Sequence, residues 1–238
     1  KIQGLNLSCT SEELKDDEEI VSIASKYALY YASERLRDNK DICLVAVKSF
    51  GSSIEYVSER LKDDKDIVMH SLMENGLNLK FASERLRDDK SVVLEAISRN
   101  AFALKYASEN LRSNEVIVTP LLKTNIEILE FVSEKLKDNK DFLIKVINKN
   151  SKALFYATDN LKKDKEVVMA AVAKSISALQ YASYELKDDS EVIYAAVSKN
   201  TSALRFASKR IKLLCKEQEK KNVIDFLKVL SLSEGLMQ

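Results

Sequence analysis

The chain has 238 residues, of which 45% are hydrophobic and 32% are charged, so it can form both a buried core and a solvated surface. Its 38 basic and 37 acidic residues give a formal net charge of +1, which lacks the basic excess typical of nucleic-acid-binding proteins. Four glycines and one proline are too few for a sheet with many tight turns. No apolar run approaches the roughly 20 residues that a membrane span needs. We therefore expect an all-α protein with neither nucleic acid nor membrane as partner.

A leucine that recurs every 25 residues defines an internal repeat. This anchor column holds Leu36, Leu61, Leu86, Leu111, Leu136, Leu161, Leu186 and Ile211. Leu14 precedes Leu36 by 22 residues, so we expect the first repeat to be truncated. The residue five positions before each anchor is always aromatic. This aromatic column holds Tyr31, Tyr56, Phe81, Tyr106, Phe131, Tyr156, Tyr181 and Phe206.

Each repeat is predicted to contain two helices, such as Ser91–Asn100 and Ala101–Leu111. An aspartate or asparagine stands before the first helix, where its side chain can accept the unpaired backbone N–H groups. These expected N-caps are Asp64, Asp89, Asn139, Asp164 and Asp189. An asparagine also marks the junction between the two helices, as a left-handed C-cap or as a second N-cap. These junction residues are Asn75, Asn100, Asn125, Asn150 and Asn200.

A rotation of about 100° per residue places Leu104, Ala107, Ser108 and Leu111 on one side of the second helix, with Tyr106 at the edge of that face. The aromatic column can therefore form wedges between repeats or a ladder of rings along a groove. Helices of about ten residues are marginal alone and need neighbouring repeats for stability. The sequence predicts an α-solenoid of about nine stacked helix-turn-helix repeats over residues 1–212, followed by a helical cap over residues 213–238.

Pro120 interrupts the repeat pattern. Thr119 can act as an N-cap with proline at the first helical position, which would restart the helix there. We expect a shortened first helix in this repeat and a bend near residues 113–126. After Ile211 the pattern stops, and the amphipathic segment Val223–Leu232 is expected to cap the last repeat. A helix lying on a membrane surface is the alternative for this segment.

The segments Glu166–Leu179 (EVVMAAVAKSISAL) and Glu191–Leu204 (EVIYAAVSKNTSAL) show the repeat pattern most clearly. This pattern resembles a family of tandem helical repeats described as a domain of unknown function, found in bacterial proteins that include effectors of intracellular pathogens. The resemblance covers nearly all of residues 7–211 and is weakest around Pro120. It implies a helical-repeat fold without catalytic residues, and a cytoplasmic location, which is the host cytosol for a secreted effector.

Residues with catalytic or metal-binding chemistry are few. His70 is the only histidine, and its column accepts many residue types, so we expect a solvated side chain without a role. Three distant cysteines indicate a reducing compartment. Cys9 and Cys43 fall in apolar columns and are expected to be buried, whereas Cys215 is expected to be exposed. Without zinc-type spacing or a glycine-rich phosphate loop, we expect no catalytic residue, metal or cofactor, and no enzymatic activity.

Two charged columns flank the anchor leucines and are the candidate partner-binding residues. The acidic column, two positions before the anchor, holds Glu34, Glu59, Glu84, Glu109, Glu134 and Asp159. The basic column, one position after the anchor, holds Arg37, Lys62, Arg87, Arg112, Lys137 and Lys162. Pairs at i,i+3 stabilise a helix by about 0.2–0.5 kcal/mol each. The columns form either a self-neutralising soluble face or a charged groove for an extended partner.

The leading hypothesis is a non-enzymatic scaffold that binds a protein or peptide. Extended repeat surface, charge neutrality and the lack of catalytic groups favour it. A partner- or substrate-positioning module of a larger enzyme is the alternative, because the chain starts at Lys1 without a methionine and inside a predicted helix. Nucleic-acid binding is disfavoured, since the positions that would read bases in a helical-repeat protein are acidic here.

Overall fold

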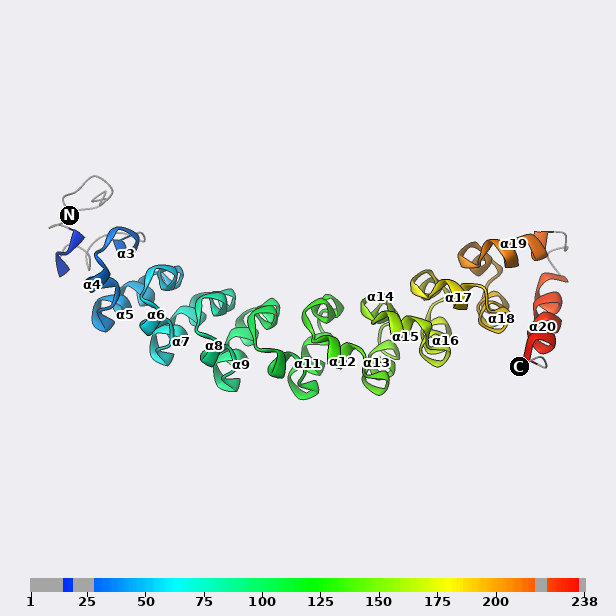
Figure 1. Cartoon of the computed structure of the whole chain (residues 1–238), viewed down its shortest axis with the longest axis horizontal. Helices are drawn as coiled ribbons and strands as arrows, with labels where there is room; N and C mark the ends of the chain where they lie inside the picture. The colour runs from blue at the N-terminus through cyan, green and yellow to red at the C-terminus, as the bar shows by residue number, and fades with distance from the viewer. Residues whose placement is uncertain (1–14, 19–27, 217–221, 236–238) are drawn as a thin grey trace. The chain divides into compact units, whose positions relative to one another are not determined.

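The computed structural model describes residues 15–18, 28–216 and 222–235 (Figure 1). Every regular element within these ranges is a helix, which confirms the all-α prediction. The chain divides into two compact units, residues 1–118 and 119–238, each of which is described by itself. The positions Cys9 and Leu14, which belong to the truncated first repeat, lie outside the described residues.

The helices follow one another in a fixed order. In unit 1 they are α3 (Ala28–Tyr31), α4 (Glu34–Arg37), α5 (Lys40–Ser49), η2 (Gly51–Tyr56), α6 (Glu59–Lys62), α7 (Lys65–Glu74), η3 (Gly76–Phe81), α8 (Glu84–Arg87), α9 (Lys90–Arg99), η4 (Ala101–Tyr106) and α10 (Glu109–Arg112). The unit boundary falls within α11 (Glu115–Leu122). In unit 2 they are η5 (Ile126–Phe131), α12 (Glu134–Lys137), α13 (Lys140–Ile147), α14 (Ala153–Tyr156), α15 (Asp159–Lys163), α16 (Lys165–Lys174), η6 (Ile176–Tyr181), α17 (Tyr184–Lys187), α18 (Ser190–Lys199), η7 (Thr201–Phe206), α19 (Lys209–Lys216) and α20 (Asn222–Gly235).

Each repeat that lies wholly within the described residues contains three short elements instead of the two predicted helices. The expected helix Ala101–Leu111 is divided into the 3₁₀ helix η4 and the single-turn α10. Ala107 between them is extended, with φ −67° and ψ 157°. Ser108 then caps α10, because its Oγ accepts the backbone N–H of Leu111 at 3.3 Å. A serine that bonds to nearby backbone N–H groups favours a new helix start over continuation of the previous helix.

The expected N-caps are confirmed. Asp64 Oδ1 accepts the backbone N–H groups of Asp66 at 3.0 Å and Ile67 at 3.3 Å, and Asp89, Asn139, Asp164 and Asp189 cap their helices in the same way. At the junction, Asn75 Oδ1 accepts the N–H of Leu77, and the φ of Asn75 is −151°. The asparagine is therefore an extended N-cap of the 3₁₀ helix and not a left-handed C-cap.

The helices stack in rows within each unit. In unit 1 the ten-residue helices α5, α7 and α9 pack side by side, as do the 3₁₀ helices η2, η3 and η4, and the short helices connect the rows (Figure 1). In unit 2 α13, α16 and α18 form the corresponding row. All eight anchors from Leu36 to Ile211 are buried, and Leu61 and Leu86 are fully inaccessible. Burial of each such side chain contributes roughly 1.5–3 kcal/mol, so the stacking predicted for an α-solenoid is confirmed.

Glycine allows an unusually close contact between two repeats in unit 1. A Cβ added to Gly76 at the start of η3 would lie 2.1 Å from the carbonyl oxygen of Ala96 in α9. The Gly76→Ala variant is therefore expected to lose about 1–3 kcal/mol of unfolding free energy in urea titrations, because two backbone segments must separate. Gly235→Ala is the matched control, since no atom lies within 4 Å of its added Cβ. Equal stability of both variants would contradict the close packing.

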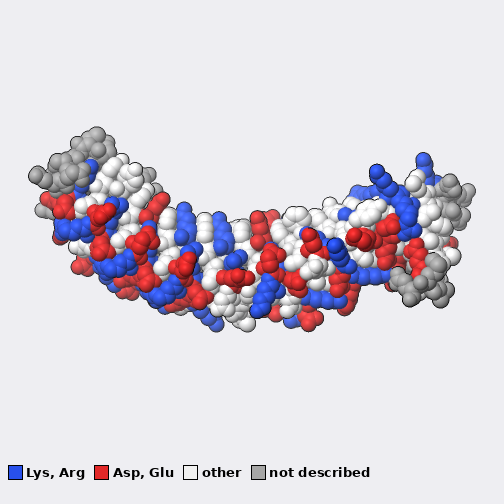
Figure 2. All heavy atoms as spheres, viewed as in Figure 1, with Lys and Arg blue, Asp and Glu red and all other residues white. Residues whose placement is uncertain are grey.

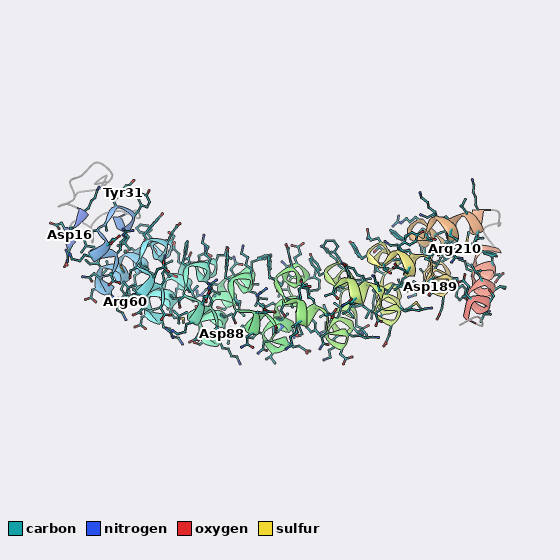
Figure 3. All side chains as sticks on the ribbon, in the orientation of Figure 1. Asp16, Tyr31, Arg60, Asp88, Asp189 and Arg210 are labelled. Atoms are coloured by element: carbon teal, nitrogen blue, oxygen red, sulfur yellow. The ribbon has the colours of Figure 1, made fainter. Side chains whose placement is uncertain are left out.

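Successive repeats are also joined by a polar clasp that the sequence analysis did not predict. The Asp63 carboxylate accepts hydrogen bonds from the Ser83 hydroxyl and from Arg85 Nε, the latter at 3.0 Å. Arg85 Nη2 also donates to the Asp63 carbonyl oxygen at 2.7 Å, and the Ser83 backbone N–H donates to the carbonyl of Lys62 at 3.0 Å. The same clasp joins Asp38 to Ser58 and Arg60, and Asp188 to Ser208 and Arg210. Figure 3 shows Arg60 and Asp88 on one side of unit 1 and Tyr31 on the other.

The clasp makes stability depend on pH. Hydrogen bonds from Ser83 and then Arg85 hold the pKa of the Asp63 carboxyl below its usual value. This contribution to stability is present above the unfolded-state pKa of about 3.9 and is lost as pH falls through the lower folded-state pKa. Asp63→Asn is expected to lower the melting temperature at neutral pH, with the difference from the parent chain disappearing in strong acid. Asp41→Asn, at an exposed position of α5, is the control. A pH-independent difference for Asp63→Asn would refute this role.

The repeat that contains Pro120 differs from its prediction. Helix α11 begins at Glu115, and Asn114 Oδ1 accepts the N–H of Val116 at 3.0 Å. The predicted restart at Thr119 is therefore wrong, because Asn114 already supplies an N-cap one turn earlier. The predicted shortening is correct, since α11 has eight residues where α7 and α9 have ten. The bend near residues 113–126 stays a prediction.

The C-terminal helix α20 covers the last ten-residue helix, α18. Its Val223 and Leu227 are buried, and Glu234 Oε2 accepts the Ser190 hydroxyl hydrogen at 2.6 Å. Glu234 near the end of α20 therefore meets the start of α18, and α20 lies beside α18 (Figure 1). Cys215 in α19 is only 3% exposed, so its predicted exposure is wrong: α20 continues the core beyond the last repeat. None of the described helices is long and apolar enough to cross a membrane.

Candidate interaction groove

The two charged columns occupy opposite ends of the single-turn helices. All six acidic residues, from Glu34 to Asp159, are exposed, as predicted. The basic residues are only partly exposed, with side-chain exposures of 17% for Lys62 and 12% for Lys137. The helical phase of the sequence could not predict that the basic side chains are less exposed than the acidic ones. The backbone beside Lys62 is held by the next repeat, because the Ser83 backbone N–H donates to the carbonyl of Lys62 at 3.0 Å.

The predicted i,i+3 pairing occurs in both units. Glu59 binds Lys62 at 2.7 Å in unit 1, and Glu134 binds Lys137 in unit 2. In Arg37 and Arg87 the Nε atoms are buried and have no hydrogen-bond partner within the described residues. Buried donors are normally paired, so these two Nε atoms are exceptions among the described residues.

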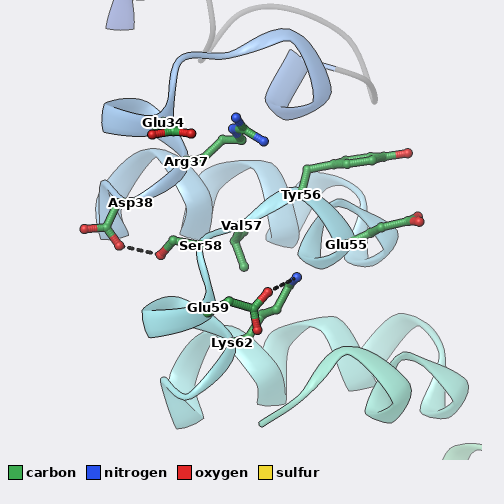
Figure 4. A pocket seen from close by; sticks show the side chains of 9 residues that line it. All are labelled: Glu34, Arg37, Asp38, Glu55, Tyr56, Val57, Ser58, Glu59 and Lys62. Atoms are coloured by element: carbon green, nitrogen blue, oxygen red, sulfur yellow. Dashed lines mark hydrogen bonds and ion pairs between the residues drawn. The ribbon is translucent and has the colours of Figure 1, made fainter.

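A pocket of about 480 Å³ opens between the repeats of Arg37 and Lys62 (Figure 4). Its lining residues are Glu34, Arg37, Asp38, Glu55, Tyr56, Val57, Ser58, Glu59 and Lys62. Figure 4 shows the Arg37 guanidinium extending to the side where Tyr56 and Glu55 lie, with Asp38 on the other side in its clasp with Ser58. The pocket thus combines an aromatic ring, two cations and four carboxylates from two consecutive repeats.

Comparison with protein families matches the chain to the family described as Domain of unknown function (DUF4116). The matches cover residues 25–62, 64–112, 117–162 and 164–212, about three-quarters of the chain. The chain belongs to this family. The DUF4116 match at residues 64–112 begins at the N-cap Asp64, ends at Arg112 of the basic column and spans two 25-residue repeats. Comparison with curated proteins and with solved structures gave no match.

The aromatic column of the DUF4116 repeats includes rings that pack between repeats, and the ladder of rings along a groove stays a prediction. Every ring from Tyr31 to Phe206 is half-buried, and Tyr56 lines the pocket. Between repeats, the ring centroids of Tyr30 and Tyr56 lie 5.2 Å apart in unit 1. Those of Phe155 and Tyr181 are also 5.2 Å apart in unit 2. Tyr56 and Tyr181 therefore pack against the preceding repeat, and Tyr56 also presents its ring to the pocket.

Other chemically versatile residues of the DUF4116 repeats include His70 and Cys43. His70 is half-buried, and its Nδ1 lies 2.8 Å from the Asp66 carbonyl oxygen, to which it donates. Burial raises the pKa of the Cys43 thiol to about 12, which keeps it protonated at neutral pH. Within the described part of the chain, no three histidine, cysteine, aspartate or glutamate side chains cluster to hold a metal.

Proposed function

We propose that the chain is a non-enzymatic scaffold that binds an extended peptide segment of a partner protein. The observation that carries this proposal is the pocket formed by Arg37, Tyr56 and the acidic residues Glu34 and Glu59. These residue types recur at 25-residue spacing, so the sequence repeats the same lining along each unit. The two units contain equivalent columns, and each can bind a peptide by itself.

The polar groups of the pocket match the main chain of an extended peptide. Such a peptide offers alternating N–H donors and C=O acceptors. The Arg37 guanidinium lines the pocket and carries hydrogen-bond donors, and the exposed carboxylates of Glu34 and Glu84 are acceptors. Half-buried aromatic rings between these groups provide the apolar contact that dominates the affinity of many interfaces. The mixed charge of the lining favours a neutral main chain over a polyanion such as nucleic acid.

The spacing of the repeats also fits an extended peptide. Packed helices lie roughly 8–10 Å apart, and an extended chain advances about 3.3 Å per residue. One repeat therefore corresponds to about three peptide residues. A peptide of about twelve residues would contact four consecutive repeats within one unit.

The cellular setting forms part of the same proposal. The resemblance to repeats of bacterial effectors supports a role as an interaction domain of such a protein, acting in the cytoplasm or, after secretion, in the host cytosol. An interaction domain requires binding surface and no catalytic group. Assay of the intact chain for a bound protein partner in that compartment would test this setting.

The binding proposal is tested by selecting peptides from a displayed library of random twelve-residue sequences against the full chain. Affinities of the selected peptides are then measured by fluorescence anisotropy. We expect Tyr56→Ala and Phe81→Ala each to weaken binding to unit 1 roughly tenfold, as is common for aromatic hot spots. Met73→Ala is the control, since Met73 is exposed and apolar but lies on α7 in the other row of helices.

Two results would contradict the proposal. The first is a library that yields no peptide whose binding survives resynthesis in solution. The second is binding that is insensitive to Tyr56→Ala and Phe81→Ala but is weakened by Met73→Ala, which would place the site on the row of ten-residue helices. Circular dichroism of each variant ensures that the fold is retained.

A further inference from the structure

One exposed position in every repeat varies widely in chemistry while its neighbours stay constant. It lies immediately before each aromatic residue. This variable column holds Tyr30, Glu55, Lys80, Lys105, Glu130, Phe155, Gln180 and Arg205. All eight side chains are exposed, whereas the preceding residue is always leucine or isoleucine and the following residue is always a ring. The backbone geometry is therefore fixed on both sides of a position that is free to change.

Contacts with the rings hold the variable side chains in equivalent places. The Lys80 ammonium lies 4.4 Å from the centroid of the Phe81 ring, and the Lys105 ammonium lies 4.7 Å from that of Tyr106. Tyr30 packs edge-on against Tyr31 at 4.7 Å in the same way. In unit 2, Phe155 meets Tyr156 at 4.8 Å and Arg205 meets Phe206 at 4.5 Å. These five side chains are thus positioned by the ring that follows each of them.

One residue of the variable column, Glu55, lines the pocket. Glu55 lines it together with Tyr56 and Arg37, and Figure 4 shows Glu55 and Tyr56 extending to the same side. Figure 2 shows basic side chains over η3 and η4 of unit 1, the elements that contain Lys80 and Lys105. Exposed charges at unrelated surface positions would not recur at a fixed place before an aromatic ring. In unit 1, Glu55, Lys80 and Lys105 are exposed charges that recur at 25-residue spacing in η2, η3 and η4.

We propose that the variable column determines which peptide sequence the chain binds. In unit 1, Glu55 would bind a basic side chain of the peptide, and Lys80 and Lys105 would each bind an acidic side chain. About three residues per repeat then separate these partner residues, which gives the peptide the pattern Lys-x-x-Glu-x-x-Glu or the same pattern in reverse order. This inference rests on the proposed peptide binding and specifies its sequence preference.

The test uses fluorescein-labelled peptides of twelve residues on a glycine–serine–proline background. The first pair of peptides contains the proposed pattern, one peptide for each order along the chain. The second pair contains the same two patterns with the basic and acidic residues exchanged. For the full chain at low ionic strength, the better member of the first pair is expected to bind about tenfold more tightly than its charge-reversed counterpart, from three exposed ion pairs together. Shortening the interval from three residues to two is expected to remove this preference.

A charge-swapped variant provides the decisive comparison. The triple variant Glu55→Lys, Lys80→Glu and Lys105→Glu is expected to prefer the charge-reversed peptide. Lys48→Glu changes the net charge by the same amount at an exposed position of α5 and is expected to leave the original preference unchanged. Inversion by the triple variant alone supports the assignment.

The outcomes separate this inference from the proposed function. If library-selected peptides bind but the triple variant does not invert the charge preference, the variable column does not determine specificity and peptide binding itself stands. If the preference also inverts with Lys48→Glu, overall charge and not position controls binding, which overturns the inference. If no peptide binds through the groove, both proposals fail.

Discussion

Replacing Leu86 with alanine is expected to lower the free energy of unfolding by about 2–5 kcal/mol. Leu86 is fully buried at the centre of α8, where it lies between the caps Ser83 and Asp89. The substitution removes apolar contacts and leaves a cavity that the surrounding short helices can fill only in part. Because each repeat depends on its neighbours, the loss is expected to affect the stacking of adjacent repeats as well.

Leu94→Ala is the matched control for this prediction. Leu94 stands in the adjacent helix α9 and is 42% exposed, so its truncation is expected to change stability by less than about 1 kcal/mol. Urea titrations followed by circular dichroism give both values. Similar losses for the two variants would contradict the assignment of Leu86 to the core and with it the role of the anchor column.

Replacing Pro120 with alanine is expected to stabilise the protein by up to about 3 kcal/mol. Pro120 is the sixth residue of α11, where its ring removes a backbone donor and crowds the preceding turn. Alanine occupies the equivalent position in two other repeats, as Ala170 in α16 and Ala195 in α18, and both of those helices have ten residues. The variant α11 is therefore expected to lengthen toward the same size.

The reciprocal substitution, which introduces a proline where another repeat has alanine, tests the same argument. Ala170→Pro places a proline at the sixth residue of α16 and is expected to destabilise unit 2 by a similar amount. If Pro120→Ala lowers stability instead, α11 must need proline for a packing contact that alanine cannot replace. Thermal unfolding of the two variants beside the parent chain distinguishes these results.

Much of the fold could be predicted from the sequence because burial and capping leave a strict pattern. The 25-residue spacing of anchors such as Leu61 and Leu86 defined the repeats, and the caps Asp64 and Asp89 marked the helix starts. The sequence did not predict that the second helix is divided in two, because Ser108 is compatible with either arrangement. A small residue at that phase belongs to a buried helical face, and the same residue is a strong N-cap. Only the hydrogen bond to Leu111 settles the choice.

The candidate site was predicted less completely, since it depends on contacts between repeats. Pairing of Lys62 with Glu59 follows from their spacing within one helix. The low exposure of the Lys62 side chain does not follow from that spacing, and neither does the clasp of Asp63 with Ser83 and Arg85. These contacts join residues 20 and 22 positions apart, a distance that a single helical period does not relate. The pocket is likewise assembled from two repeats.

The structure of the full chain bound to a library-selected peptide tests the central claim most directly. The account predicts an extended peptide that follows η2, η3 and η4, touches the rings of Tyr56 and Phe81, and places about three residues on each repeat. A peptide bound along α5, α7 and α9, or one folded into a compact shape at a single repeat, would contradict it.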